Sequence, residues 1–246
     1  MRTLGIDLAA SPKTTAAAVV DWADDGTARV TPPRLRCGDD ELLALITGLA
    51  DDDRVGVDCP FGWPVAFVEA VAAHTEGRPW PGRGTDSATH RATMRFRRTD
   101  LVVREATGRY PLTVAFDRLG AAAARWAHLA DGLAALGRPV ERAGTGQVTE
   151  VYPAAARRRW GLGPERSMTE LCAAAPWLRC GAAERAAYDT SEHAFDALIA
   201  ALVARAVALG LTAGPATEAD ARAAAVEGWV HLPDEGSLAA LRHPLP

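Results

Sequence analysis

One motif occurs twice in this sequence and limits the folds open to the chain: LGID at residues 4–7 and VGVD at residues 55–58. In each copy a run of apolar residues ends in a single aspartate, and a loop containing proline follows. Such apolar runs are typical of buried central strands in a sheet rich in parallel pairs. A bare carboxylate beside an apolar core is costly. We therefore expect Asp7 and Asp58 to lie at the carboxyl ends of their strands, with something cationic between them.

The composition is that of an ordinary globular protein. The chain has 246 residues, of which 48% are hydrophobic and 24% are charged, enough for one large domain or two small ones. The net charge of −4 gives no general electrostatic attraction to nucleic acid. No apolar run approaches the ~20 residues needed to cross a bilayer.

The cysteines and the amino-terminal segment favour a cytoplasmic protein. No pair of cysteines has CxxC spacing, so we expect reduced thiols rather than a zinc site or a disulfide framework. The amino terminus enters a predicted strand at once, without the basic segment and apolar stretch of a signal peptide. The four cysteines are Cys37, Cys59, Cys172 and Cys180.

The first sixty residues predict a mixed sheet. Residues 2–9, 15–22 and 28–36 are expected to form strands joined by short turns, which indicates an antiparallel meander. A helix over about 39–50 and a strand over 54–58 follow. A strand–helix–strand connection implies a right-handed crossover, so the strand at 54–58 should pair in parallel.

The rest of the chain is predicted to be mainly helical. Residues 59–146 read as helical or irregular, and they include an arginine-rich run over 86–109. The chain returns to a strand at 147–152. The expected helices cover residues 64–74, 117–136, 154–160, 167–175, 191–209 and 218–225.

The predicted helix over 191–209 carries an acid beside its apolar face. Asp196 lies three and seven residues before Ile199 and Val203, which places it at the border of the buried side. Glu192 lies one turn earlier on the same side. An acid at the start of a helix can simply favour the helix dipole. That explanation suits Glu192 better than Asp196, which lies a turn or more inside the helix.

Several motifs along the chain, in combination, resemble one bacterial family. That family is known as domain of unknown function 429 and comprises predicted ribonuclease H-like nucleases. The resemblance spans nearly the whole chain, and the motif of the long helix is also similar to that of Holliday-junction resolvases. The motifs are GIDLA, GVDCPFGWP, RRTD (97–100), EVYPAA (150–155), SEHAFDALIAALVA (191–204) and EGWVHLP.

The resemblance implies a ribonuclease H-like α/β fold. Its five-stranded mixed sheet has three antiparallel strands followed by parallel ones and is flanked by helices. The whole chain, 1–246, would be a single domain with a helical cap insertion over 59–146, between the fourth and fifth strands. Minimal members of this fold have only a short helical connection at that place.

The resemblance also implies a two-metal site for phosphodiester hydrolysis. Asp7, Asp58 and Asp196 would converge and bind Mg²⁺ or Mn²⁺. Carboxylate oxygens are the hard ligands that Mg²⁺ prefers. Two such ions can activate a water molecule and stabilise the leaving oxygen. Without a cation, clustered carboxylates repel one another and some should have raised pKa values.

Further residues are candidates for catalysis or substrate binding. Glu150 lies in a predicted strand next to the site, where it would be either another catalytic ligand or the structural partner of an arginine. His193 would orient a water or a phosphate, although a structural histidine is the commoner case. The remaining substrate-binding candidates are Arg95, Arg98, Asp100 and Lys13.

Three functions follow from these expectations. The leading one is a metal-dependent nuclease that cuts DNA or RNA, alone or as a homodimer. The second is a non-catalytic module that binds nucleic acid or protein on the same fold. The third is an ATP-dependent phosphotransferase of the related sugar-kinase topology, but no second phosphate loop is found. The acidic net charge argues against tight binding to long duplexes, so we expect either a small or special nucleic-acid substrate or a partner protein that supplies affinity.

Overall fold

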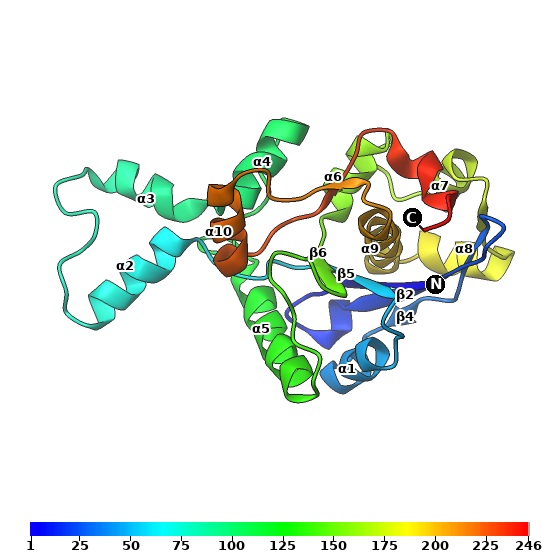
Figure 1. The fold of residues 1–246 in the computed structure, drawn as a ribbon, viewed down its shortest axis with the longest axis horizontal. Helices are drawn as coiled ribbons and strands as arrows, with labels where there is room; N and C mark the ends of the chain where they lie inside the picture. The colour runs from blue at the N-terminus through cyan, green and yellow to red at the C-terminus, as the bar shows by residue number, and fades with distance from the viewer. Residues whose placement is uncertain (246) are drawn as a thin grey trace.

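The computed structural model describes residues 1–245 and shows an α/β fold built on a mixed sheet (Figure 1). The strand order is β6-β5-β1-β2-β3-β7, and β4 pairs with β2 beside this path. The strands are β1 (Arg2–Asp7), β2 (Ala16–Trp22), β3 (Ala28–Val30), β4 (Arg34–Leu35), β5 (Arg54–Asp58), β6 (Val148–Glu150) and β7 (Leu178–Arg179).

The strand directions follow the predicted pattern. β1 runs antiparallel to β2 and β2 antiparallel to β3, which is the expected meander. β5 then pairs with β1 in parallel, and β6 pairs with β5 in parallel. In this register Asp7 lies directly beside Asp58.

The main sheet has seven strands where five were expected. The predicted strand over 28–36 is interrupted at Pro32 and Pro33, which have no N–H to donate to a ladder. β3 therefore ends at Val30, and the chain pairs with β2 again as β4. The seventh strand, β7, is a two-residue edge strand parallel to β3, too short to be recognised from periodicity.

Every predicted helix is present within a few residues, and three further helices were not predicted. These are α3 and α8, whose residues are mostly exposed, and α4, whose buried side includes the polar residues Thr99 and Asp100, so none shows a broad apolar stripe. The helices are α1 (Asp39–Thr47), α2 (Val65–Thr75), α3 (Ser87–Arg95), α4 (Arg98–Thr107), α5 (Gly120–Ala135), α6 (Pro153–Arg159), α7 (Met168–Ala174), α8 (Ala182–Asp189), α9 (Glu192–Ala208) and α10 (Glu218–Glu227), with short 3₁₀ helices η1 (Pro12–Thr14) and η2 (Ser237–Arg242). A second small sheet pairs β8 (Thr212–Ala213) with β9 (Leu232–Pro233).

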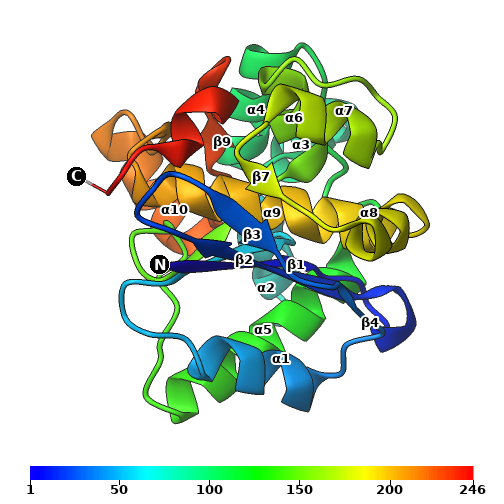
Figure 2. The ribbon, with the colours of Figure 1, turned by 90° about the vertical axis from the view of Figure 1, so that its right-hand side faces the viewer.

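The sheet is covered on both faces. Helix α9 crosses one face, while α1 and α5 cover the other (Figure 2). A Cβ atom at Gly5 would collide with the α9 backbone at Ala197 and Ala201, and one at Gly56 would collide with Ala200. The glycines of the LGID and VGVD motifs, Gly5 and Gly56, therefore let α9 lie directly on the two central strands. This close approach brings the amino-terminal half of α9 near the carboxyl ends of β1 and β5.

The insertion over 59–146 is not a single compact cap. Helices α2 and α3 extend away from the sheet as an arm, whereas α5 returns beneath the sheet beside α1 (Figure 1). Helix α4 packs between α6 and α10. Across residues 1–245, no helix is both long enough and apolar enough to span a membrane.

Candidate active site

Two carboxylates lie side by side at the ends of the central parallel strands. Asp7 ends β1 and Asp58 ends β5, and the two residues are partners in the parallel register. Burial raises the pKa of Asp58 well above its usual value, and the charges of Asp7 and Asp196 raise it further. Burial likewise raises the pKa of Asp7 to about 6, although a hydrogen bond from His193 opposes the shift. The fold thus holds negative charge at this edge of the sheet at a cost.

Asp196 approaches the same edge from helix α9. Its charge raises the pKa values of both strand aspartates, so the three carboxylates lie within electrostatic reach of one another. Its Oδ2 accepts hydrogen bonds from Nε and Nη2 of Arg166, at 3.0 and 2.6 Å. Its Oδ1 is buried and has no hydrogen-bond partner in the described part of the chain. An orphaned carboxylate oxygen of this kind retains a free ligand position.

Arg166 is the site residue that the sequence did not reveal. It lies in the loop between α6 and α7, and it contacts Glu192 as well as Asp196. Its positive charge lowers the pKa values of Asp7 and Asp58. No local pattern distinguishes this arginine from the many others, because only the tertiary fold brings its loop to α9.

His193 lies one turn before Asp196 on α9 and pairs with Asp7. The distance between His193 Nδ1 and Asp7 Oδ2 is 2.6 Å. The imidazole is about half exposed, with 45% of the side chain accessible, so its other nitrogen is open to solvent or to a ligand. In this arrangement His193 orients the Asp7 carboxylate.

Glu150 is the structural partner of an arginine, which is one of the two roles expected for it. Arg97 donates from Nη2 to Oε1 at 2.8 Å and from Nη1 to Oε2 at 3.0 Å, and both side chains are buried. The backbone N–H of Phe61 also donates to Oε2. Both carboxylate oxygens of Glu150 are therefore engaged by the protein, and a metal would have to break a buried ion pair to bind there.

The other substrate-binding candidates are distributed more widely. Asp100 is buried and pairs with Arg97, so it belongs to the same network as Glu150. Arg98 pairs with Asp220 on α10 at 2.5 Å. Arg95 is exposed at the end of α3, and Lys13 is exposed in η1. Of the predicted cluster, the structure brings together Asp7, Asp58, Asp196 and His193.

Cys59, next to Asp58, is a buried thiol rather than a nucleophile. Burial raises its pKa well above the usual value, and the charges of Glu150 and Asp58 add to the shift. A thiol held neutral in this way is unreactive.

The three aspartates have the right ligand atoms for a hard divalent cation, but in this structure they lie too far apart to bind one ion together. Their donor set is all oxygen, one buried oxygen is orphaned, and their mutual repulsion calls for positive charge. Within residues 1–245, however, no three His, Cys, Asp or Glu side chains converge closely enough to hold one ion. Arg166 and His193 already engage two of the aspartates, so metal binding would require these pairs to open.

A pocket of about 250 Å³ adjoins Asp7 and Asp58. It opens between the ends of β1, β5 and β6 on one side and the insertion on the other. Its lining is Asp7, Leu8, Asp58, Cys59, Pro60, Arg97, Asp100, Pro111, Leu112, Leu119, Ala122, Glu150, Val151, Tyr152 and Val230.

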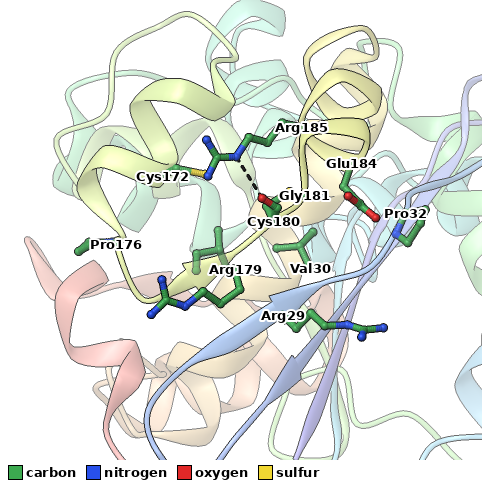
Figure 3. Close-up of a pocket in the computed structure, with 11 residues that line it drawn as sticks. Arg29, Val30, Pro32, Cys172, Pro176, Arg179, Cys180, Gly181, Glu184 and Arg185 are labelled. Atoms are coloured by element: carbon green, nitrogen blue, oxygen red, sulfur yellow. Dashed lines mark hydrogen bonds between the residues drawn. The ribbon is translucent and has the colours of Figure 1, made fainter.

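A larger hollow of about 760 Å³ lies away from these carboxylates, beside β3 and β7 (Figure 3). Arg29, Arg179 and Arg185 surround it, but their guanidinium groups point in different directions. Since these cations do not converge on a common point, this hollow lacks the features of an anion site.

Comparison with known proteins identifies the family but no characterised relative. The model of the family described as "Protein of unknown function (DUF429)" matches residues 5–221. No curated protein and no solved structure matches the chain significantly. The match includes Asp7, Asp58, Asp196 and Arg166.

Proposed function

We propose that this chain, which belongs to the DUF429 family, is a metal-dependent nuclease that hydrolyses phosphodiester bonds on a ribonuclease H-like fold. The observation that carries the proposal is the parallel pairing of Asp7 with Asp58, with Asp196 within electrostatic reach of both. Clustered carboxylates that are costly to ionise are more often found at functional sites than elsewhere.

The sheet supports the finer fold assignment. Its central order, β3-β2-β1-β5-β6, has three antiparallel strands followed by two parallel ones, as the ribonuclease H-like topology requires. Helix α9 crosses the strands and delivers an acid to their carboxyl ends. Strands β4 and β7 are short additions at the side of the meander and leave this central order unchanged.

Asp7, Asp58 and Asp196 would hold Mg²⁺ or Mn²⁺ after a rearrangement that brings the three carboxylates closer together than they lie in this structure. When bound, such an ion supplies Lewis-acid stabilisation of phosphate oxygens and lowers the pKa of a bound water. The contacts of His193 with Asp7 and of Arg166 with Asp196 would open for the ion to enter, which would free His193 and Arg166 to face the phosphate. DNA or RNA is the proposed substrate, and its phosphate would approach the exposed His193 edge.

Metal-dependent stabilisation tests this proposal directly. Thermal melts with and without millimolar Mn²⁺ are expected to show a gain that reaches about 2.7 kcal/mol at 100 times the dissociation constant. The Asp7→Asn variant should lose most of this gain and all phosphodiesterase activity. Asp52→Asn, which changes an exposed aspartate away from the site, is the matched control. Absence of any Mn²⁺ shift in the wild type would remove the physical support for a metal enzyme.

The pairs that occupy the acids favour one alternative. Because Arg166 and His193 already engage Asp196 and Asp7, a non-catalytic module that binds nucleic acid or protein is the second candidate. Such a module would bind oligonucleotides without cutting them, with or without Mn²⁺. A phosphotransferase would instead turn over ATP in the same assay.

A further inference from the structure

The pocket beside the paired aspartates has mainly apolar walls. Leu8 comes from the end of β1, Val151 from the end of β6 and Val230 from the carboxyl-terminal segment, while Leu112 and Ala122 come from the insertion. Its charged lining consists of Asp7 and Asp58 at the strand ends and of Arg97, which pairs with Asp100 and Glu150. An apolar slot that adjoins a hydrolytic site is suited to the uncharged part of a substrate.

The size of the slot limits what can enter. Its volume of about 250 Å³ lies below the ~300–1,000 Å³ of pockets that take drug-sized ligands. One flat heterocycle fits a slot of this volume, and an unpaired base enters it without the unstacking and unpairing cost of a base in a duplex. Tyr152 lines the slot and supplies a hydroxyl that can hydrogen-bond to a base edge.

Aromatic and arginine side chains continue from the pocket rim. Phe96 stacks on Tyr110 with ring centroids 4.4 Å apart, and Tyr110 directly precedes the pocket residues Pro111 and Leu112. The guanidinium of Arg95 lies over the Phe96 ring, and that of Arg104 lies over the Tyr110 ring. Tyr110 and both arginines are exposed. Interleaved aromatic and cationic groups of this kind are typical of surfaces that bind single-stranded nucleic acid.

We propose that the pocket is a subsite for one unpaired nucleobase, so that the substrate is single-stranded nucleic acid or an unpaired end. This proposal rests on the proposed nuclease function and names its substrate class. The base next to the cleaved phosphate occupies the slot, and the strand continues over the Phe96–Tyr110 cluster. A chain with a net charge of −4 has little attraction for a long duplex, and insertion of a base supplies affinity without it.

Nucleosides test the subsite separately from the metal. Adenosine, guanosine, cytidine and thymidine carry a base but no phosphate, so the carboxylates do not repel them. Methyl NMR in the presence of EDTA follows Leu8, Val151 and Val230 at the pocket wall. Each nucleoside is expected to shift these methyls and to bind at least tenfold more tightly than ribose, which lacks a base.

Two substitutions at the wall give matched comparisons. Ala122→Leu fills the slot, and Ala124→Leu adds the same side chain to an exposed position of the same helix. Leu112→Asp places a charge in the pocket lining at a side chain that is 57% exposed, where substitutions usually change stability little. Leu136→Asp, at a residue that is 60% exposed, is its control. Ala122→Leu and Leu112→Asp should each weaken adenosine binding at least fivefold, and the controls should not.

Oligonucleotides then test the strand preference. Single-stranded oligothymidylate should displace adenosine from the pocket methyls, and the same strand annealed to oligoadenylate should not. Equal binding of ribose and nucleosides, or displacement by the duplex, would overturn the subsite while leaving a Mn²⁺ shift and cleavage intact. Nucleoside binding without any Mn²⁺-dependent thermal stabilisation would support the base subsite and contradict the proposed metal-dependent nuclease.

Discussion

At the scale of single residues, the molecule holds negative charge at a partly buried edge of its sheet. Asp7 and Asp58 share one strand-end edge, and burial makes both harder to ionise. The protein compensates with the Arg166 guanidinium on Asp196 and with the contact between His193 Nδ1 and Asp7 Oδ2. The Arg166 guanidinium supplies part of the positive charge that a bound divalent ion would supply.

The raised pKa of Asp7 predicts a pH dependence of stability. The folded protein holds a proton on Asp7 up to about pH 6, whereas an ordinary aspartate releases it near 3.8. Stability in EDTA should therefore be highest near pH 4 and fall as the pH rises through 6, by on the order of 3 kcal/mol. Urea unfolding at each pH measures this. Asp7→Asn should flatten the profile, Asp52→Asn should not, and an unchanged profile in Asp7→Asn would contradict the assignment.

Arg166 predicts an opposite pair of effects on stability and metal binding. Arg166→Met leaves a largely buried carboxylate without its partner, so the metal-free protein should lose about 1–3 kcal/mol. Mn²⁺ should then stabilise the variant more than the wild type, because the competing guanidinium is gone. Thermal melts with and without Mn²⁺ check both signs. Arg185→Met, which removes an exposed arginine bonded to a backbone carbonyl, is the control.

The sequence predicted this part of the site unevenly. Asp7 and Asp58 could be found because each ends an apolar strand, and Asp196 because it interrupts an apolar helix face. Glu150 follows from the same logic, yet its partner Arg97 lies 53 residues away and decided its role through tertiary contact. Arg166 had no local pattern at all. Periodicity identifies the element that carries a residue and does not identify its partner across space.

At the scale of elements, the two motif glycines explain how α9 reaches the site. Gly5 and Gly56 leave no room for a side chain beneath Ala197, Ala200 and Ala201. The helix is alanine-rich along this contact, so two backbones pack closely. The apolar patterns of the sequence predict the strands and the helix, but they do not show that the two glycines make the contact between them.

Substitution of Gly5 should therefore disturb the whole central packing. Gly5→Ala forces the α9 backbone away from β1, and overpacking of this kind typically costs 1–3 kcal/mol or more. Urea unfolding should show a lower midpoint. Gly214→Ala, at a glycine with open space around it, should be nearly neutral. Equal effects of the two substitutions would show that close helix–strand contact is not what Gly5 provides.

A buried network of charges joins the insertion to the sheet. Arg97, at the start of α4, contacts Glu150 on β6, Asp100 on α4 and the carbonyl oxygen of Glu227 at the end of α10. The Glu227 carboxylate in turn accepts from the backbone N–H of Val65 at the start of α2. One arginine thus fixes where the insertion leaves the body of the protein.

Removal of this arginine should cost more than removal of its neighbour. Arg97→Met leaves the buried carboxylates of Asp100 and Glu150 without their partner. Removal of one partner of a buried ion pair typically costs about 3–5 kcal/mol of folding stability. Arg98→Met removes a side chain that is 42% exposed and should cost about 1 kcal/mol or less. Chemical unfolding of both variants measures the difference. A similar cost for the two would contradict the role assigned to the network.

At the scale of the whole molecule, the insertion is built into the body at both ends and extends outward only in the middle. The sequence located its limits from the loss of strand patterns after 58 and their return near 147. It did not separate the projecting α2–α3 arm from α5, because the apolar side formed by Trp126, Leu129 and Leu133 predicts burial and does not show what the helix packs against. Only the packing of α5 beside α1 shows that part of the insertion belongs to the core.

Limited proteolysis should distinguish this arrangement from an independent domain. The loop over 76–86 is almost wholly exposed, so trypsin is expected to cut first after Arg83. The two pieces should remain together, because β6 on the second piece pairs with β5 on the first and α9 packs across β1 and β5. Gel filtration should show one unchanged particle, while a denaturing gel shows two bands.

The same digest supplies its own control. Arg83→Gln should delay the first cut without altering stability, because Arg83 is an exposed loop residue. The Mn²⁺ shift should survive the nick, since Asp7 and Asp58 on one piece remain held against Asp196 on the other by the sheet and α9. Release of residues 64–140 as a stable folded fragment would show instead that the insertion folds independently of the sheet that it adjoins.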